Sequence, residues 1–310
     1  MFNFRTDLAS ERKDVYQKAN NLSQIEGIEV EKKDINENIL IERVKITSSE
    51  GEKAIGKPQG LYVTMDIKKL KIAEDEEITL AGETLSSELK NIIGSHVKSD
   101  GEILVVGLGN VYVTPDSLGP KVIQNIEITR HIINYLPQYV NEGTRMVSAI
   151  SPGVLGTTGI ETLEILKGIV DNIKPKLVIV IDALASRSIE RISSTVQISD
   201  TGIVPGAGVG NTRKEISIKT LGIPVVAIGI PTVVETAVLV NDSLDLFISK
   251  LQQDAKSNDY LNKLKEQDNY EEIKNALIPS DFNLIVTPKE IDELIENMTK
   301  IVSTGINLAM

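Results

Sequence analysis

The strongest hydrophobic signal in the sequence is a set of short aliphatic runs that are apolar at nearly every position. Strands of a parallel sheet are covered on both faces, so they read as continuous apolar runs rather than alternating ones. Segments of helical character separate and follow these runs, and this alternation predicts an α/β fold. We therefore expect a three-layer α/β/α architecture with a mostly parallel central sheet. The expected strands occupy residues 103–106, 145–151, 176–183 and 223–230, and the expected helices occupy residues 119–136, 160–172 and 232–250.

The two ends of the chain show other patterns. Residues 28–47 alternate between apolar and polar positions, which predicts a β-hairpin. Residues 252–282 are polar and charged, and we expect them to form a helical excursion on the surface. No linker divides the chain, so a single domain is expected. The remaining elements are helices at 8–26, 74–94 and 288–304, a loop at 51–60 and a strand at 61–67.

Composition narrows the classes of function. The 310 residues contain no cysteine, which excludes a disulfide framework, a thiol nucleophile and a cysteine-ligated metal. A net charge of −11 argues against unspecific binding to nucleic acid or to an anionic membrane. No stretch approaches the ~18 consecutive apolar residues of a membrane-spanning helix. These features fit a cytoplasmic protein that acts on a neutral or basic partner.

Two aspartates each stand just beyond one of the apolar runs. Asp116 follows the run at 103–106, and Asp182 ends the run VIVID. The carboxyl ends of strands line the crevice in which open α/β sheets bind ligands. Two carboxyl groups brought together there can share one proton and perform acid–base chemistry on a peptide bond. On the residues alone, each aspartate is equally well explained as a helix cap, and Asp182 also as the ion-pair partner of a nearby arginine.

Glycine-rich loops supply candidates for binding a substrate carbonyl. SPGVLGTTGIET leads into an expected helix, and GAGVGN lies in a later loop. Backbone N–H groups in such loops can stabilise an oxyanion, although a plain strand-to-helix turn explains the glycines as well. The candidate positions are Gly153, Gly156 and Thr157 in the first loop and Gly206 and Gly208 in the second.

Other chemical motifs are incomplete. A dinucleotide fingerprint begins at Gly107 but has Tyr112 where its third glycine belongs. GEKAIGKP resembles a P-loop but has Pro58 at the Ser/Thr position. His96 and His131 lie in no zinc-binding pattern, and no GxSxG elbow accompanies the serines. We therefore predict neither a cofactor nor a bound metal.

Five long strings resemble the germination protease family of spore-forming Firmicutes. The resemblance implies an atypical aspartic endopeptidase that starts the degradation of small acid-soluble spore proteins during germination. It further implies a fold similar to that of hydrogenase-maturation endopeptidases, and a homotetramer made as a zymogen in the cytoplasm of the forespore. The strings are FRTDLASE, VVGLGNVYVTPDSLGP, SPGVLGTTGIET, VIDALASRSIERISSTVQISDTGIVPGAGVGN and TLGIPVVAIGIPTVV, which span most of the chain.

The resemblance also assigns residues. The family's catalytic aspartates fall on Asp116 in TPDSLGP and Asp182 in IDALASRS. Members process themselves within a sequence like that of their substrates, after an acidic residue. TDLASE, near the N-terminus, is such a sequence, so the resemblance implies cleavage between Asp7 and Leu8. Residues 1–7 would then be a propeptide and residues 8–310 a single peptidase domain.

An enzyme this acidic needs a local basic pocket to recognise an acidic residue next to the cut. We expect Arg187, Arg191 and Arg213 to read that residue, with Lys214 as a further candidate. Small acid-soluble spore proteins are the expected substrates, with no direct nucleic-acid partner and no membrane partner.

Three alternatives remain open on the sequence. Asp116 and Asp182 can be metal ligands in a maturation-type peptidase, although no third ligand is evident. The glycine loops can belong to a non-catalytic module that binds anions or nucleotides. The chain can also be a scaffold in which both aspartates only cap helices.

Overall fold

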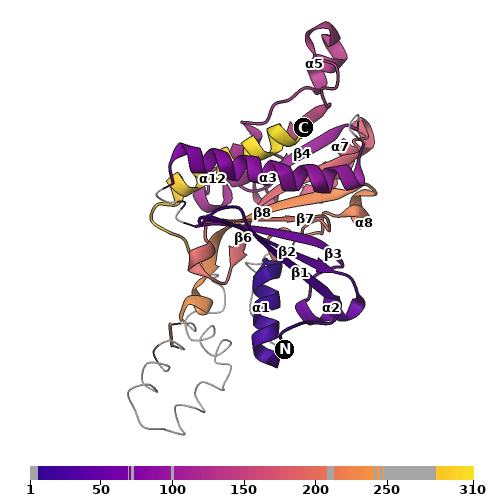
Figure 1. The fold of residues 1–310 in the computed structure, drawn as a ribbon. Helices are drawn as coiled ribbons and strands as arrows, with labels where there is room; N and C mark the ends of the chain where they lie inside the picture. Colours follow the sequence, from indigo (N-terminus) through magenta and orange to yellow (C-terminus); the bar gives the residue numbers. More distant parts are fainter. Residues whose placement is uncertain are drawn as a thin grey trace, which may run out of the picture.

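The computed structural model is built around one central sheet (Figure 1). It describes residues 6–68, 70, 73–98, 101–207, 213–240, 243–244, 247 and 284–310. The strand order is β1-β2-β3-β7-β8-β6-β4-β5, and β9 pairs with β8. The strands are β1 (Ile28–Asp34), β2 (Ile39–Ile46), β3 (Gly60–Ile67), β4 (Ile103–Gly107), β5 (Val147–Ile150), β6 (Leu177–Ser186), β7 (Thr195–Ser199), β8 (Val225–Glu235) and β9 (Ile285–Val286).

The sheet has a parallel half and an antiparallel half. β5, β4, β6 and β8 run parallel to their neighbours, as the aliphatic runs predict. β7 pairs antiparallel with β8 and with β3, and the hairpin of β1 and β2 continues this antiparallel half. The α/β class is therefore confirmed, but the sheet is mixed rather than mostly parallel. The difference arises because the N-terminal strands join the same sheet through β7, whose segment at 191–200 is polar and has only weak β character in the sequence.

Helices cover both faces of the sheet. On one face, α3 and α12 pack against alternate residues of the strands, including Ile179 and Ile181 of β6. On the other face, α7 covers Val178 and Val180, while α1 and α2 cover the antiparallel half. Figure 1 shows α3 and α12 on one side of the sheet and α1 and α2 on the other. The helices are α1 (Ala9–Asn20), α2 (Ser49–Ile55), α3 (Asp75–His96), α4 (Leu118–Ile123), α5 (Arg130–Tyr135), α6 (Leu155–Thr158), α7 (Thr162–Ile173), α8 (Ile218–Leu221) and α12 (Ile291–Ala309).

The face of the sheet that carries α1, α2, α7 and α8 is here called the groove-side face. It contains a polar strip between its two groups of helices. Asp182 on β6 and Gln197 on β7 are both register partners of Gly229 on β8. Register partners point to the same face of a sheet, so these side chains lie on one line across three strands. Hydrophobic packing by the helices on either side leaves this strip as the region available for chemistry.

Three sequence expectations differ locally from the structure. The segment expected to be a loop at 51–60 contains α2, because the Ser48 hydroxyl accepts a hydrogen bond from Gly51 N at 3.3 Å and caps the helix. The helix expected at 119–136 is two short helices, α4 and α5. Between them Thr129 leaves the helical path to bond Val147 at the start of β5. β8 continues to Glu235, beyond the expected helix start at 232. The helical excursion expected at 252–282 lies outside the described residues.

Candidate active site

Asp182 occupies the groove-side face of β6. Val178 and Val180 share that face and are fully buried, so the carboxyl group follows a wholly apolar stretch of strand. The side chain is itself only 5% exposed. Its Oδ1 accepts one hydrogen bond, from Ala183 N at 3.0 Å. Within the described residues Asp182 has no ion-pair partner, so the ion-pair explanation of this residue does not hold.

Asp116 is placed by a tight loop after β4. Gly109 adopts φ +112°, and a Cβ there would lie 2.1 Å from the Asp116 carbonyl oxygen, so only glycine permits this close approach. Asn110 N donates to the Asp116 carbonyl at 3.0 Å and to Oδ2 at 2.8 Å. Asp116 therefore closes its own loop, and Ser117, not Asp116, is the N-cap of α4. The helix-cap explanation of Asp116 does not hold.

Both aspartates line a single pocket of about 310 Å³, here called the aspartate pocket. Its walls come from the ends of β4 and β6 and from the two glycine-rich loops. Gly153, Gly206 and Arg213 line it, as expected, whereas Gly156 and Thr157 do not. The Thr157 hydroxyl is turned back to the Val154 carbonyl at 2.9 Å. Gly208 lies outside the described residues. Further lining residues are Leu108, Val113, Pro115, Val154, Leu155, Thr162, Leu184, Pro205, Thr232, Val233 and Ile285.

Burial perturbs both carboxyl groups of the aspartate pocket. Loss of hydration raises the pKa of Asp116 to about 6, opposed by its hydrogen bond from Asn110. The pKa of Asp182 is raised well above its ordinary value, first by burial and then by the charges of Asp116 and Asp7. The charge of Asp116 thus disfavours ionisation of Asp182, so the two carboxyl groups do not ionise together. Such a separation of two neighbouring acids is typical of acid–base catalysis.

The N-terminal string TDLASE lies beside this pocket rather than in solvent. Asp7 N donates to Ala185 O at 3.1 Å, and Ala185 N donates back to Asp7 Oδ2 at 3.1 Å. Gln197 Nε2 donates to the Asp7 carbonyl at 3.2 Å, and Gln197 Oε1 accepts from Ala9 N at 2.7 Å. Gln197 thus spans the Asp7–Leu8 bond, and the Leu8 side chain is fully buried.

A second pocket, of about 220 Å³, surrounds Asp7 and shares Leu184 with the aspartate pocket. We call it the Asp7 cradle. Arg12 and Lys57 line it together with Gln197. The other lining residues are Gly56, Pro58, Tyr62, Ser199, Thr201, Gly202, Ile203, Val204, Ala207, Glu215, Ala227 and Gly229.

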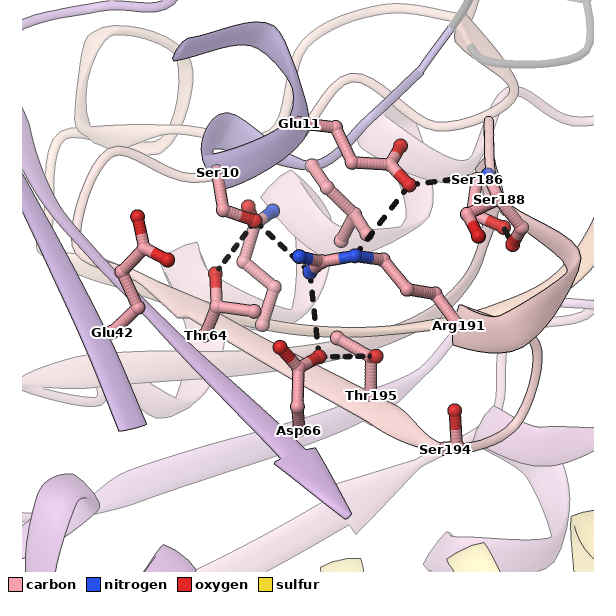
Figure 2. Close-up of polar contacts among 12 residues, drawn as sticks. Ser10, Glu11, Glu42, Thr64, Asp66, Ser186, Ser188, Arg191, Ser194 and Thr195 are labelled. Atoms are coloured by element: carbon pink, nitrogen blue, oxygen red, sulfur yellow. Dashed lines mark hydrogen bonds and ion pairs between the residues drawn. The ribbon is translucent and has the colours of Figure 1, made fainter. Parts of the chain in front are cut away.

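The end of the TDLASE string is held by a polar network around Glu11 (Figure 2). The Glu11 carboxylate accepts from Arg187 N at 2.9 Å and Ser188 N at 3.2 Å, and it contacts the Arg191 guanidinium at 3.7 Å. Figure 2 shows the same guanidinium reaching Ser10 and Asp66, at 3.1 and 3.3 Å. The Arg187 backbone and the Arg191 guanidinium therefore contact Glu11, four positions after Asp7, and Arg213 is the expected acid reader that lines the aspartate pocket.

Sequence reasoning missed Gln197, Lys57 and Arg12 as site residues. Gln197 reaches the site through the pairing of β7 with β8, which no local pattern reveals. Lys57 lies in the segment that imitates a P-loop, and it follows the end of α2. In TVQIS, Gln197 shares its face of the strand with Thr195 and Ser199, opposite Val196 and Ile198, and this wholly polar side was the one available signal for Gln197.

The remaining motifs serve packing or lie apart from the site. Gly107 stands where a Cβ would meet Gly119 O at 2.2 Å, so it permits α4 to approach β4. His96 lies 4.0 Å from Asp200, away from both aspartates. No group of three or more potential metal-ligating side chains occurs in the described part of the chain. No helix among the described residues is long and apolar enough to cross a membrane.

Comparison with known proteins gives one consistent family. The family model described as "Germination protease" matches residues 5–264 and 259–310. The chain is 47% identical to the germination protease of Caldanaerobacter subterraneus subsp. tengcongensis, covering 99% of this chain and 94% of the relative. It is 45% identical to that of Clostridium acetobutylicum, with 100% and 96% covered, and 42% identical to that of Priestia megaterium, with 100% and 94% covered.

Among solved structures, the chain is similar to a NiFe hydrogenase maturation protease from Thermococcus kodakarensis. The TM-score is 0.31 at 15% identity, with 69% of this chain and 98% of that chain covered. The sequence matches span the whole protein, including both aspartates and the string around Asp7. The chain therefore belongs to the germination protease family, and it is an endopeptidase of spore germination.

Proposed function

We propose that this chain is an aspartic endopeptidase in which Asp116 and Asp182 form the catalytic dyad. One observation carries the proposal: two carboxyl groups, one from the loop after β4 and one from β6, line one pocket, and burial raises the pKa of both. Carboxyl groups that lie in one pocket titrate as a coupled pair, so the dyad as a whole holds one proton near neutral pH. That charge state provides one base and one acid at the same place.

The environments of the two groups favour particular roles. Asp116 is the more exposed and ionises first, so it takes a proton from the attacking water. Asp182 keeps its proton and donates a hydrogen bond to the scissile carbonyl, which stabilises negative charge on that oxygen. When the tetrahedral intermediate collapses, the proton held by Asp116 passes to the leaving amine. Backbone at Gly153 and Gly206, which line the same pocket, supplies the candidate donors to the oxyanion.

The proposed substrates are the small acid-soluble proteins of the spore, and the first substrate is the chain itself. Supporting self-cleavage, the Asp7–Leu8 bond is held between β6 and β7, next to the aspartate pocket. Cleavage there would release residues 1–7 as a propeptide. The family resemblance further supports a homotetrameric zymogen in the cytoplasm of the forespore, with no nucleic-acid or membrane partner.

The dyad is tested with Asp116→Asn and Asp182→Asn in the full chain, assayed by intact mass for loss of residues 1–7 and by cleavage of a purified small acid-soluble protein. Each variant should lose at least about 10³-fold of both activities, and the double variant should lose little more, because the two groups act as one unit. Asp171→Asn on the exposed surface of α7 is the matched control. Full activity in either dyad variant refutes the proposal, and loss of activity with a chelator would favour the metal-assisted alternative.

A further inference from the structure

The Asp7 cradle is lined by two cations, Arg12 and Lys57, and by two acidic side chains, Asp7 and Glu215. Arg12 and Lys57 line the pocket in which Asp7 sits, and the Asp7 carboxylate favours the charged form of each. One oxygen of that carboxylate is bound by Ala185 N at 3.1 Å. The cradle therefore presents a backbone donor and two positive side chains to the residue that precedes the proposed cut.

Arg12 and Lys57 differ in the hydrogen bonds that they already form. The Arg12 guanidinium donates to the carbonyl of Thr6 at 2.9 Å and to those of Ile55 and Gly56 at 3.3 and 3.4 Å. These bonds fix the end of α2 against α1, so Arg12 mainly holds backbone. Lys57 forms no hydrogen bond and no ion pair with any other described residue. Its ammonium group is the cation left over for a ligand.

The backbone around Lys57 is held on both sides. Arg12 binds the carbonyls of the two residues before it, and the Tyr62 hydroxyl donates to the Pro58 carbonyl at 2.9 Å after it. Burial lowers the pKa of Lys57 to about 8, and the neighbouring Asp7 charge opposes that shift. A partly buried ammonium without a partner is costly, and an incoming carboxylate offsets the cost.

We propose that Lys57 is a specificity-determining residue that binds the side-chain carboxylate of the residue preceding the cut, Asp7 in self-cleavage and an acidic residue in other substrates. This inference rests on the proposed function. It assigns the role to Lys57 rather than to Arg191, which is engaged by Glu11 and Asp66, or to Arg213, which lines the aspartate pocket.

A cycle of full-length variants tests the proposal by the rate of self-cleavage, followed by intact mass. Asp7→Asn and Lys57→Met should each slow cleavage at least about 10-fold, the loss expected when one partner of a desolvated charge pair is removed. The double variant should be no slower than the slower single variant, since the pair is already broken. Lys53→Met, on the exposed face of α2, should cleave like the parent chain.

Charge reversal separates recognition from folding. Asp7→Lys combined with Lys57→Glu should cleave faster than either reversal alone, and Lys57→Arg should retain most activity. Additive losses in the cycle, or no recovery in the reversed pair, would overturn the role of Lys57. If the parent chain never loses residues 1–7, the proposal of self-cleavage is refuted. Lys57 is then tested with separate peptide substrates that carry Asp or Asn before the cut. An unchanged preference for Asp in Lys57→Met contradicts the proposal.

Discussion

The aspartate pocket and the Asp7 cradle lie side by side on one face of the sheet, yet their chemistry is opposite. In the aspartate pocket, two acids are stripped of water and each accepts only local backbone hydrogen bonds. In the cradle, the N-terminal string is bound by strand backbone, by Gln197 and by Arg12. The first region holds two acids with few partners, whereas the second binds the chain next to the proposed cut through hydrogen bonds. Reactivity and recognition are thus divided between neighbouring pockets that share Leu184.

Substitution of Gln197 tests most directly whether recognition and catalysis are separate, because Gln197 binds the N-terminal string and does not line the aspartate pocket. Gln197→Ala removes the donor to the Asp7 carbonyl and the acceptor for Ala9 N. We expect self-cleavage to slow about 30-fold, since two hydrogen bonds worth about 1 kcal/mol each are lost. The titration of Asp116 should not change. Intact mass over time measures the cleavage rate.

Gln197→Glu refines that experiment. It keeps an oxygen to accept from Ala9 N but loses the donor to the Asp7 carbonyl, so its rate should resemble that of the alanine variant if the carbonyl contact matters most. Faster cleavage in either variant would mean that Gln197 holds the bond away from the dyad rather than presenting it.

An effect on stability rather than on rate tests the aspartate pocket. Because the folded-state pKa of Asp182 is raised, its stability contribution is complete below the ordinary value of 3.8 and is lost as pH rises toward the folded-state pKa. Asp182→Asn should therefore increase the free energy of unfolding at pH 7 by about 1–3 kcal/mol, with little effect near pH 3.5. Asn keeps an acceptor for Ala183 N.

Denaturant unfolding at both pH values measures this difference, with Asp171→Asn as an exposed control expected to change stability by less than about 0.5 kcal/mol. An advantage of equal size at pH 3.5 and pH 7 would show that packing, and not ionisation, distinguishes the variant.

The contrast between the two pockets also separates the site residues that can be predicted from the sequence from those that cannot. Asp116 and Asp182 are predictable because each is associated in the sequence with an aliphatic run, and the carboxyl ends of parallel strands meet at one edge. In the structure Asp182 lies within β6 and Asp116 in the loop after β4. The parallel half of the sheet follows from the same aliphatic runs. Gln197 and Lys57 are not predictable in this way. Their neighbours are set by strand order and by the docking of α2, which depend on contacts between residues far apart in the chain.

Local sequence patterns give the wrong prediction where the same residues support two different structures or partners. The Ser48 cap of α2 is visible in the sequence, but the glycines that follow suggest a loop. Arg191 lies in the segment expected to read an acid, and it does contact one, at Glu11 rather than Asp7. Residue type thus indicated the kind of interaction, while the fold determined the partner.

The central claim is that Asp116 and Asp182 share one proton in a common pocket. Carbon-13 NMR of the aspartate side chains, titrated from pH 3 to pH 9 in the full chain, tests it directly, with each Asp→Asn variant providing assignment. We expect Asp116 to titrate near pH 6 while Asp182 remains protonated. Ionisation of both carboxyl groups near pH 4 would contradict it.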